Sequence, residues 1–203
     1  MNQRAKDQIA IVILAAGASK RMSAIKQLLP WKQTTLINHC IEQSAGSKAQ
    51  EVFVVLGAHV EEILQNLNPK ARVLMNPEWE QGMGTSIARA MYFFEKKALF
   101  FNAVLFVLVD QPLLDSKYLN RLINNYIATN KNIVASQIKE GAGVPVILNR
   151  IYFKKLKKLD QDYGAKRILA ENWQDVLVLD SEEKNRDVDT MEAYAALYEA
   201  YGK

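Results

Sequence analysis

The sequence contains a single cysteine, Cys40, among its 203 residues. One cysteine forms neither an intrachain disulfide nor a cysteine-rich zinc site, so the small secreted proteins that depend on disulfides are excluded as a class. A protein that folds without such crosslinks suits a reducing compartment, and we expect it in the cytoplasm. Cys40 itself is expected to pack as a small apolar side chain.

Long hydrophobic runs are also lacking. The first residues, MNQRAKDQIAIVILAAGA, have the basic start and the apolar stretch of a signal peptide. However, the apolar stretch is short, Asp7 lies in the leader, and cleavage would remove what reads as a core strand, so we expect the segment to be retained. No segment approaches the roughly 20 apolar residues that cross a bilayer, and no membrane partner is expected.

Two phosphate-binding motifs and a strong charge imbalance are missing as well. The sequence has no G-x-x-x-x-G-K-S/T and no G-x-G-x-x-G, which excludes a P-loop ATPase and the usual dinucleotide-binding fold. Lys and Arg number 26 against 22 Asp and Glu, which gives a net charge of +4. This excess favours anionic ligands only weakly and is too small for a nucleic-acid-binding stripe, so no nucleic-acid partner is expected.

The sequence does contain a regular alternation of apolar and amphipathic stretches, which predicts a three-layer α/β/α fold with a Rossmann-like, mostly parallel sheet. Without a repeat or a Pro/Gly-rich linker, residues 1–203 are expected to form a single domain. Thr85-Ser86, Asp115-Ser116 and Asp189-Thr190 suit helix N-caps. Short apolar runs predict strands at 9–14, 51–57, 71–76, 103–109, 132–136, 144–148 and 175–180. Spaced apolar positions predict helices at 34–45, 59–67, 85–98, 116–129, 151–159, 164–172 and 190–201.

The segment ILAAGASKRMSAIK, residues 13–26, leaves the first predicted strand through small residues and then supplies cations. In such sheets, ligands bind beyond the carboxyl ends of the strands. The small side chains at Ala15, Ala16 and Gly17 leave the backbone N–H groups accessible to an oxyanion, and Gly17 is able to adopt a positive φ. Arg21 and Lys26 would neutralise that anion. The segment predicts a phosphate-binding loop; the alternative is a tight strand-to-helix turn followed by surface cations.

The stretch VLFVLVDQP runs from a buried strand directly into Asp110. A carboxylate at the tip of this strand faces the same edge of the sheet as the phosphate-binding loop. Mg²⁺ prefers oxygen ligands and is often held by one or two carboxylates together with substrate phosphates. Asp110 is therefore a candidate metal ligand. In the alternative, it only initiates the turn before Pro112.

The stretch RDVDT, residues 186–190, contributes two more carboxylates near the C-terminus. If this segment is extended, Asp187 and Asp189 share one face. One of them is then a candidate for the second metal ligand. Asp189 or Thr190 also suits the N-cap of the last helix, a role that is compatible with metal binding.

Motifs along nearly the whole chain occur in the order found in one enzyme family. LAAGASKRM with Lys26, KQLLPW, NPEWEQGMGTS, VDQP, GAGVPV, DYGAKRIL and DVDT resemble the motifs of the MobA-like nucleotidyltransferases. NPEWEQGMGTS, GAGVP and DYGAK narrow the resemblance to the molybdenum cofactor cytidylyltransferase branch. It implies the nucleotide-diphospho-sugar transferase type of α/β fold. At Ser23, at Val144 and in DVDTMEAY the sequence departs from the family's usual residues.

The resemblance also implies roles for particular residues. Arg21 and Lys26 would contact the triphosphate of a nucleotide, with Lys26 nearest the α-phosphate. Asp110 and one of Asp187 or Asp189 would hold Mg²⁺. The residues implied to line the nucleotide, including its base and ribose, are Leu14, Ala15, Ala16, Gly17, Asn76, Gly82, Met83 and Ser86.

The reaction that the resemblance implies is attack by a terminal phosphate on the α-phosphorus of a nucleoside triphosphate, with release of pyrophosphate. This chemistry depends on positioning and charge neutralisation, which agrees with the lack of a Ser/His/Asp or Cys/His set. LAAG, where guanosine-using relatives read LAGG, implies CTP. The implied acceptor is molybdopterin or molybdenum cofactor, and the product would pass to a molybdenum hydroxylase. Two alternatives stay open: a sugar or polyol phosphate as acceptor, and a non-catalytic nucleotide-binding or cofactor-chaperone protein.

Overall fold

A computed structural model describes residues 8–139, 141–160 and 164–203. Its main sheet has seven strands in the order β5-β4-β1-β6-β8-β7-β9. Neighbouring strands are parallel except where β8 pairs with β6 and β7, so β8 alone runs against the others. The strands are β1 (Ile9–Leu14), β4 (Glu51–Leu56), β5 (Arg72–Met75), β6 (Ala103–Leu108), β7 (Ile133–Ile138), β8 (Gly141–Asn149) and β9 (Val176–Leu179). The mostly parallel sheet confirms the predicted fold class, and each predicted strand is present.

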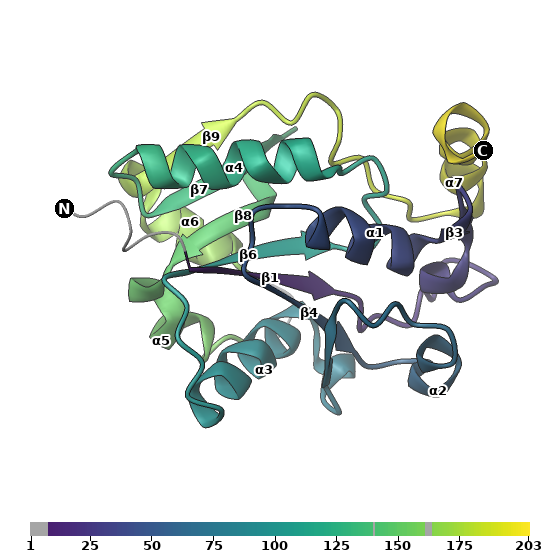
Figure 1. Ribbon diagram of the computed structural model, residues 1–203, viewed down its shortest axis with the longest axis horizontal. Helices are drawn as coiled ribbons and strands as arrows, with labels where there is room; N and C mark the ends of the chain where they lie inside the picture. The colour runs from purple at the N-terminus through teal and green to yellow at the C-terminus, as the bar shows by residue number, and fades with distance from the viewer. Residues whose placement is uncertain (1–7, 140, 161–163) are drawn as a thin grey trace.

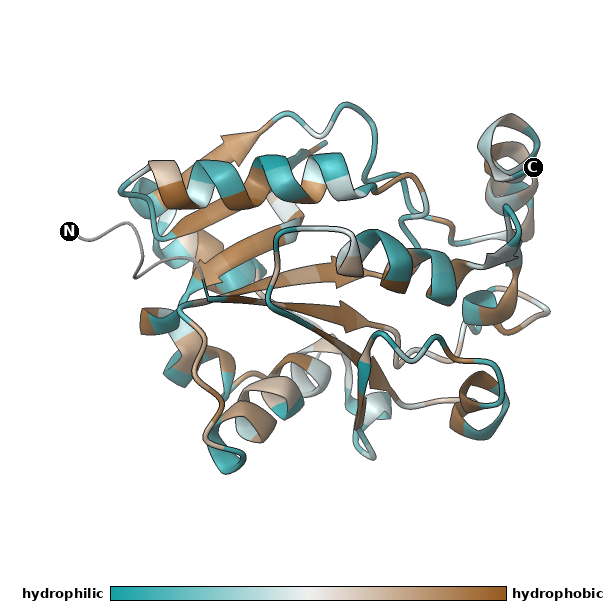
Figure 2. Cartoon of the chain, in the orientation of Figure 1, coloured by the Kyte–Doolittle hydropathy of each residue, from teal (hydrophilic) through white to brown (hydrophobic). Residues whose placement is uncertain are grey.

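Strand β1 shows why continuous apolar runs belong to the middle of this sheet. All six of its residues are buried. Ile9, Ile11 and Ile13 face one hydrophobic core, whereas Ala10 and Val12 face another. Because successive side chains point to opposite faces, a strand that is covered on both faces needs an apolar residue at every position. Figure 2 shows these hydrophobic strands between helices that carry many of the hydrophilic residues.

Helices cover both faces of the sheet (Figure 1). On one face, α1 (Leu36–Ala45) and α4 (Ser116–Ala128) pack against the core that contains the β1 isoleucines. On the other face lie α3 (Met83–Lys96), α5 (Phe153–Leu156) and α6 (Lys166–Glu171). The short α2 (Val60–Leu64) follows β4. Within the described ranges, no helix combines the length and the apolar character that a membrane span requires.

The C-terminal helix packs outside these layers. α7 (Met191–Leu197) joins a small apolar cluster with the ribbon of β2 (Pro30–Trp31) and β3 (Thr34–Thr35), which has no counterpart among the predicted elements. The hydroxyl of Tyr194 donates to the Pro30 carbonyl oxygen over 2.6 Å. Val188 is fully buried in the same cluster. The segment that carries the C-terminal carboxylates is therefore anchored at Val188 and, after it, through α7.

Two of the three predicted helix caps are confirmed. Asp115 caps α4 and Thr190 caps α7, each through a side-chain oxygen that accepts a backbone N–H of the first turn. Because Thr190 is the cap, Asp189 keeps its carboxylate for other contacts. The cap expected at 85–86 is wrong, since α3 already begins at Met83 and those two residues lie inside the helix.

Candidate active site

Three parallel strands end at one edge of the sheet and position the loops of the candidate site. β4, β1 and β6 are neighbours and end at Leu56, Leu14 and Leu108. The N–H of Ala15 extends the pairing of β1 by donating to a carbonyl oxygen of β4 over 3.0 Å. The loop after β1 therefore begins at this edge, beside the loop that follows β6.

The four residues implied to line the nucleotide from the first loop differ in exposure. Leu14, Ala15 and Ala16 are buried, whereas Gly17 is exposed and a Cβ atom there would meet nothing within 4 Å. Gly17 does not use its freedom to adopt a positive φ; the turn instead uses Ser19, whose φ is 55°. Open space in front of the loop, rather than a left-handed backbone, is the feature that Gly17 provides.

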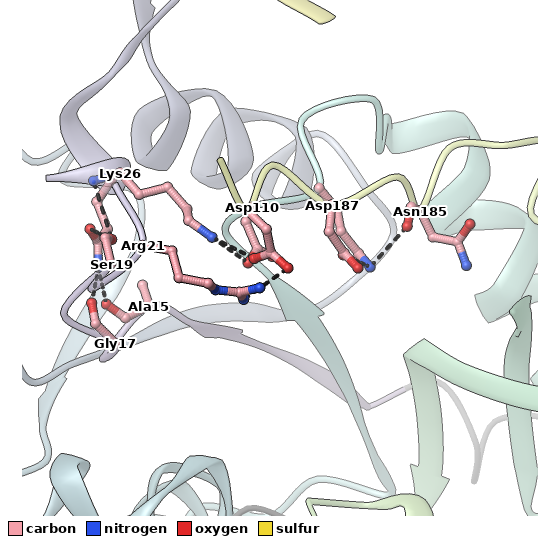
Figure 3. A network of polar contacts seen from close by, with 11 residues as sticks. Ala15, Gly17, Ser19, Arg21, Lys26, Asp110, Asn185 and Asp187 are labelled. Atoms are coloured by element: carbon pink, nitrogen blue, oxygen red, sulfur yellow. Dashed lines mark hydrogen bonds and ion pairs between the residues drawn. The ribbon is translucent and has the colours of Figure 1, made fainter. Parts of the chain in front are cut away.

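Lys26 is the centre of a charged cluster at this edge (Figure 3). Its Nζ lies 3.0 Å from Oδ2 of Asp110, which follows β6, and 3.1 Å from Oδ1 of Asp189, which precedes α7. Nη2 of Arg21 lies 3.0 Å from the other oxygen of Asp189. The Lys26 side chain is 10% exposed, whereas that of Arg21 is 71% exposed. The fold thus joins the residues predicted to act on phosphates to two of the three predicted metal ligands.

The cations of this cluster set the protonation of Asp189. Partial burial by itself would raise the pKa of Asp189. The hydrogen bond and charge of Lys26, followed by those of Arg21, outweigh that effect and lower the pKa below its ordinary value of 3.8. Asp189 is therefore a carboxylate at neutral pH.

Asp187 lies beside the cluster and behaves differently. The residue is exposed, but its Oδ1 accepts a 2.9 Å hydrogen bond from Nε2 of the buried Gln111. Desolvation of the carboxyl group, followed by the negative charges of Asp110 and Asp189, raises the pKa of Asp187 above 3.8 despite that bond. A cation bound nearby would oppose this effect and stabilise the charged form of Asp187.

One carboxylate oxygen of the cluster has no partner within the described part of the chain. Oδ1 of Asp110 is buried and accepts no hydrogen bond from the described residues. Since nearly all buried polar atoms in proteins are paired, this atom is suited to a ligand from outside the chain. Across the described ranges, no three Asp, Glu, His or Cys side chains converge closely enough to form a metal site by themselves. The donors fit an ion such as Mg²⁺ held by one or two carboxylates and completed by substrate phosphates.

The segment 76–86 forms a compact hydrogen-bonded turn. Asn76 is 3% exposed, and its Nδ2 donates to Oγ1 of Thr85 over 2.9 Å and to Oγ of Ser86 over 3.0 Å. Its Oδ1 accepts the N–H of Glu78. These bonds occupy the Asn76 amide inside the protein, so Asn76 and Ser86 shape the segment. Direct contact of either residue with a nucleotide stays a prediction.

Gly82 and Met83 lie where this segment enters α3. Gly82 has a φ of 113°, a backbone conformation that residues with a Cβ atom rarely adopt, so the position requires glycine. Met83 is 38% exposed. Both residues are therefore more accessible to a ligand than Asn76 and Ser86 are.

Gly57 brings the two predicted groups of nucleotide-lining residues together. A Cβ atom on Gly57 would lie 2.5 Å from side-chain atoms of Trp79 and 2.8 Å from the carbonyl oxygen of Ala16. Only glycine permits this close approach of side chain and backbone. The segment 76–86 consequently adjoins the loop after β1.

Two buried glutamines belong to the site but are absent from the predicted set. Gln27 is 2% exposed and contacts the loop after β1, and Gln111 is 5% exposed and holds Asp187. Each follows a predicted residue directly, Lys26 or Asp110. The sequence signal that could have identified them is a glutamine next to a charged residue within an apolar stretch.

Comparison with known proteins gives one family and several relatives. The family model described as a MobA-like NTP transferase domain matches residues 11–176, a range that contains every predicted site residue except Asp187 and Asp189. Nicotine blue oxidoreductase from Paenarthrobacter nicotinovorans is 30% identical over 195 residues, which are 89% of this chain and 92% of that protein. The molybdenum cofactor cytidylyltransferase of Escherichia coli K12 is 31% identical over 82 residues, which are 39% of this chain and 42% of that protein.

Solved structures show the same fold over the length of the chain. Rv0371c from Mycobacterium tuberculosis H37Rv is 26% identical, with a TM-score of 0.77, and the match covers 95% of this chain and 98% of that one. Rv0371c has also been solved as a complex with manganese, which matches with a TM-score of 0.76 at 24% identity over 95% of this chain and 99% of that one.

Proposed function

This chain belongs to the MobA-like NTP transferase family, and on that premise we propose that it transfers a nucleotidyl group from a nucleoside triphosphate to a phosphorylated small molecule. One observation carries the proposal. Lys26 and Arg21 meet Asp110 and Asp189 at the carboxyl edge of the sheet, beside a loop of small residues. Cations for phosphates and carboxylates for a metal, held in one cluster, are what transfer of a phosphoryl or nucleotidyl group requires.

Lys26 contacts the α-phosphate in this proposal. An ammonium group has three N–H donors, and Asp110 and Asp189 accept two of them. The third is directed to an α-phosphate oxygen. Because negative charge at the reacting phosphate is neutralised most strongly in the transition state, Lys26 contributes to the rate more than to nucleotide affinity.

Arg21 contacts the outer phosphates. Its guanidinium group has five N–H donors in a planar fork, and the exposed side chain directs one end of that fork to Asp189. The remaining donors suit the phosphate oxygens that leave as pyrophosphate. Arg21 therefore acts on the nucleotide both before and during the reaction.

The proposed reaction needs no covalent bond to the protein. A terminal phosphate oxygen of the acceptor forms a bond to the α-phosphorus. The bond from the α-phosphorus to the oxygen that bridges it to the β-phosphorus breaks, and pyrophosphate leaves with that electron pair. The protein contributes by holding the two reactants in line and by neutralising their charges.

Asp110 and one of Asp187 or Asp189 would hold Mg²⁺. When bound, this ion would neutralise the negative charge of the phosphates. The assignment is supported by Oδ1 of Asp110, which is buried and has no hydrogen-bond partner among the residues that the structure describes. The manganese complex of Rv0371c also supports use of a divalent metal.

For the substrates we propose CTP and molybdopterin or molybdenum cofactor. LAAG at residues 14–17 supports CTP, and the match to the Escherichia coli cytidylyltransferase supports the acceptor. Gly82 and Met83 would face the base and ribose, on a segment shaped by Asn76 and Ser86. The product would pass to a molybdenum hydroxylase in the cytoplasm, and residues 1–203 would act as one domain.

Release of pyrophosphate tests this proposal. The protein is mixed with Mg²⁺, each of the four nucleoside triphosphates, and either molybdopterin or a sugar phosphate. With molybdopterin as the acceptor, we expect pyrophosphate release from CTP to be at least about tenfold faster than from GTP, because the wrong base leaves buried polar groups unpaired. If pyrophosphate is released with a sugar phosphate as the acceptor and not with molybdopterin, the acceptor is instead a sugar phosphate. Nucleotide binding without release from any pair would indicate a non-catalytic nucleotide-binding protein.

A redox activity is the second candidate function. It is favoured by one observation, the match to nicotine blue oxidoreductase over 89% of this chain. The loss of nicotine blue absorbance on addition of NADH or NADPH tests it. If nucleotidyl transfer is the activity, the absorbance is lost no faster with the protein than without it. Rapid loss of absorbance without pyrophosphate release from any substrate pair would favour the redox function.

A further inference from the structure

Gln27 bonds to two peptide groups of the loop after β1. Its Nε2 donates to the carbonyl oxygen of Ala15 over 2.8 Å and to that of Gly17 over 2.9 Å. Figure 3 shows the ends of these two bonds at Ala15 and Gly17. With an exposure of only 2%, the Gln27 side chain is shielded from solvent competition.

Ser19 contacts the other end of the Gln27 amide. The Ser19 hydroxyl donates to Oε1 of Gln27 over 3.5 Å and accepts the backbone N–H of Lys26 over 3.3 Å. Since Oε1 is bound to a donor, Nε2 is the end that faces the loop carbonyls. These bonds attach the loop to the same short segment that carries Lys26.

The bonds of Gln27 also set the direction of two N–H groups. In a trans peptide the C=O and N–H bonds point in opposite directions. A carbonyl of Ala15 that faces Gln27 therefore turns the N–H of Ala16 away from it. The Gly17 carbonyl does the same for the N–H of Ala18.

Neither of these N–H groups has a hydrogen-bond acceptor among the described residues. Ala16 is 7% exposed and Ala18 is half-buried. Unpaired N–H groups at buried positions are rare in proteins. Successive backbone N–H groups of this kind form concave binding sites for anions.

We propose that Gln27 is a positioning residue that aims the N–H groups of Ala16 and Ala18 at the phosphates of the bound nucleotide. The inference rests on the proposed function, because it takes the anion to be the phosphate chain of a nucleoside triphosphate. Gln27 touches no substrate and acts only through the loop. Its effect is therefore specific to phosphate affinity.

Binding of CTP and of cytidine separates this role from a purely structural one. Gln27→Met keeps the length of the side chain and removes both donors. We expect the Kd of CTP, measured with Mg²⁺ by calorimetry below the melting temperature, to rise by at least about tenfold, as when hydrogen bonds to a charged group are lost. The Kd of cytidine, which has no phosphate, stays within about twofold. GTP and guanosine provide the same comparison for the other base.

Gln33→Met is the matched control, because Gln33 is exposed in the turn between β2 and β3. It leaves both Kd values unchanged. Ser19→Ala is the second variant and applies even if Gln27→Met does not fold. It frees the Gln27 amide and raises the Kd of CTP by roughly threefold, again without affecting cytidine.

An unchanged Kd of CTP in both Gln27→Met and Ser19→Ala would overturn the inference, as would an equal loss for CTP and cytidine. Either result leaves the proposed function standing, because the wild-type protein still binds the triphosphate. A wild-type protein that binds no nucleoside triphosphate would contradict the proposed function, and this inference with it.

Discussion

The charged cluster around Lys26 and the polar cluster around Asp175 lie at opposite ends of the sheet and differ in how completely their oxygen atoms are paired. Asp175 precedes β9, at the amino end of the parallel strands. Its Oδ1 accepts the N–H of Asn132 over 3.1 Å. Its Oδ2 accepts from Nδ2 of Asn132 over 2.9 Å and from the hydroxyl of Tyr152 over 2.8 Å. In the Lys26 cluster, by contrast, Oδ1 of Asp110 is buried without a partner among the described residues.

A shifted pKa does not distinguish the two ends. Burial alone would raise the pKa of Asp175, but the bonds from Asn132 and Tyr152 lower it, just as Lys26 lowers the pKa of Asp189. The difference lies in the unpaired atom. A cluster that pairs its own atoms stabilises the fold, whereas one that leaves a buried carboxylate oxygen free is prepared for a ligand.

Asp110→Asn is expected to have the largest effect. The substitution keeps the shape of the side chain and removes the negative charge that would bind the metal. The rate of pyrophosphate release therefore falls by about a thousandfold, which is ~4 kcal/mol in the barrier. Lys26 retains its ion pair with Asp189, so the melting temperature changes little. Steady-state kinetics and thermal melting check both parts. A rate that stays within about threefold would show that Asp110 is not a metal ligand in the reaction.

Lys26→Ala follows in size. Loss of a donor that acts on the reacting phosphate lowers kcat by roughly 10²–10³, or ~2.7–4 kcal/mol, with a smaller change in the KM of the nucleotide. Arg21→Ala raises KM as well as slowing the reaction, because Arg21 also acts on the bound nucleotide. Lys20→Ala is the control, since Lys20 is exposed in the same loop. If Lys20→Ala proved as damaging as Lys26→Ala, the phosphate-binding role would be assigned to the wrong cation.

Asp175→Ala tests the other end of the sheet. Three hydrogen bonds are lost there, so the free energy of unfolding, measured with urea, falls by about 2 kcal/mol. The activity of the folded protein remains within about twofold of the wild type. Asp160→Ala, at an exposed position, serves as the control. A loss of activity without a loss of stability would erase the distinction between the two clusters.

The pH dependence of stability comes last, with an expected effect no larger than that of Asp175→Ala. Burial, followed by the charge of Lys32, lowers the pKa of His39 from 6.5 to about 4. Between these values the unfolded chain binds the proton more readily, so stability contributed by neutral His39 is lost as the pH falls through this window. From pH 8 to pH 5 the loss is about 2 kcal/mol. Asp175, with a pKa lowered below 3.8, keeps its contribution over that range and loses it only in stronger acid.

Urea unfolding of the wild type, His39→Gln and His59→Gln at the two pH values checks this expectation. His39→Gln removes the titrating group and with it the additional loss at pH 5. His59→Gln, which replaces a histidine whose side chain is 38% exposed, is the control for the substitution itself. If His39→Gln showed the same loss as the wild type, another group would be responsible.

Much of this architecture could be predicted from local patterns. The apolar run of β1 indicates a strand that is buried on both faces, and Asp110 and the loop after β1 each follow such a strand. Parallel strands direct their carboxyl ends to one edge, so these two features were expected to lie close together. The start of α3 was predicted wrongly because Thr85 and Ser86, which suit an N-cap, bond to Asn76 instead.

Local sequence patterns predict the layers, the edge of the sheet at which we expect a ligand, and the residue types available there, because each depends on periodicity and on chemistry within short segments. The folded chain alone shows that Lys26 lies between Asp110 and Asp189, that Ser19 rather than Gly17 takes the positive φ, and that Gln27 bonds to the loop after β1. These arrangements depend on how buried polar groups from distant segments satisfy one another. Such pairing is a property of the folded chain as a whole, so no local pattern encodes it.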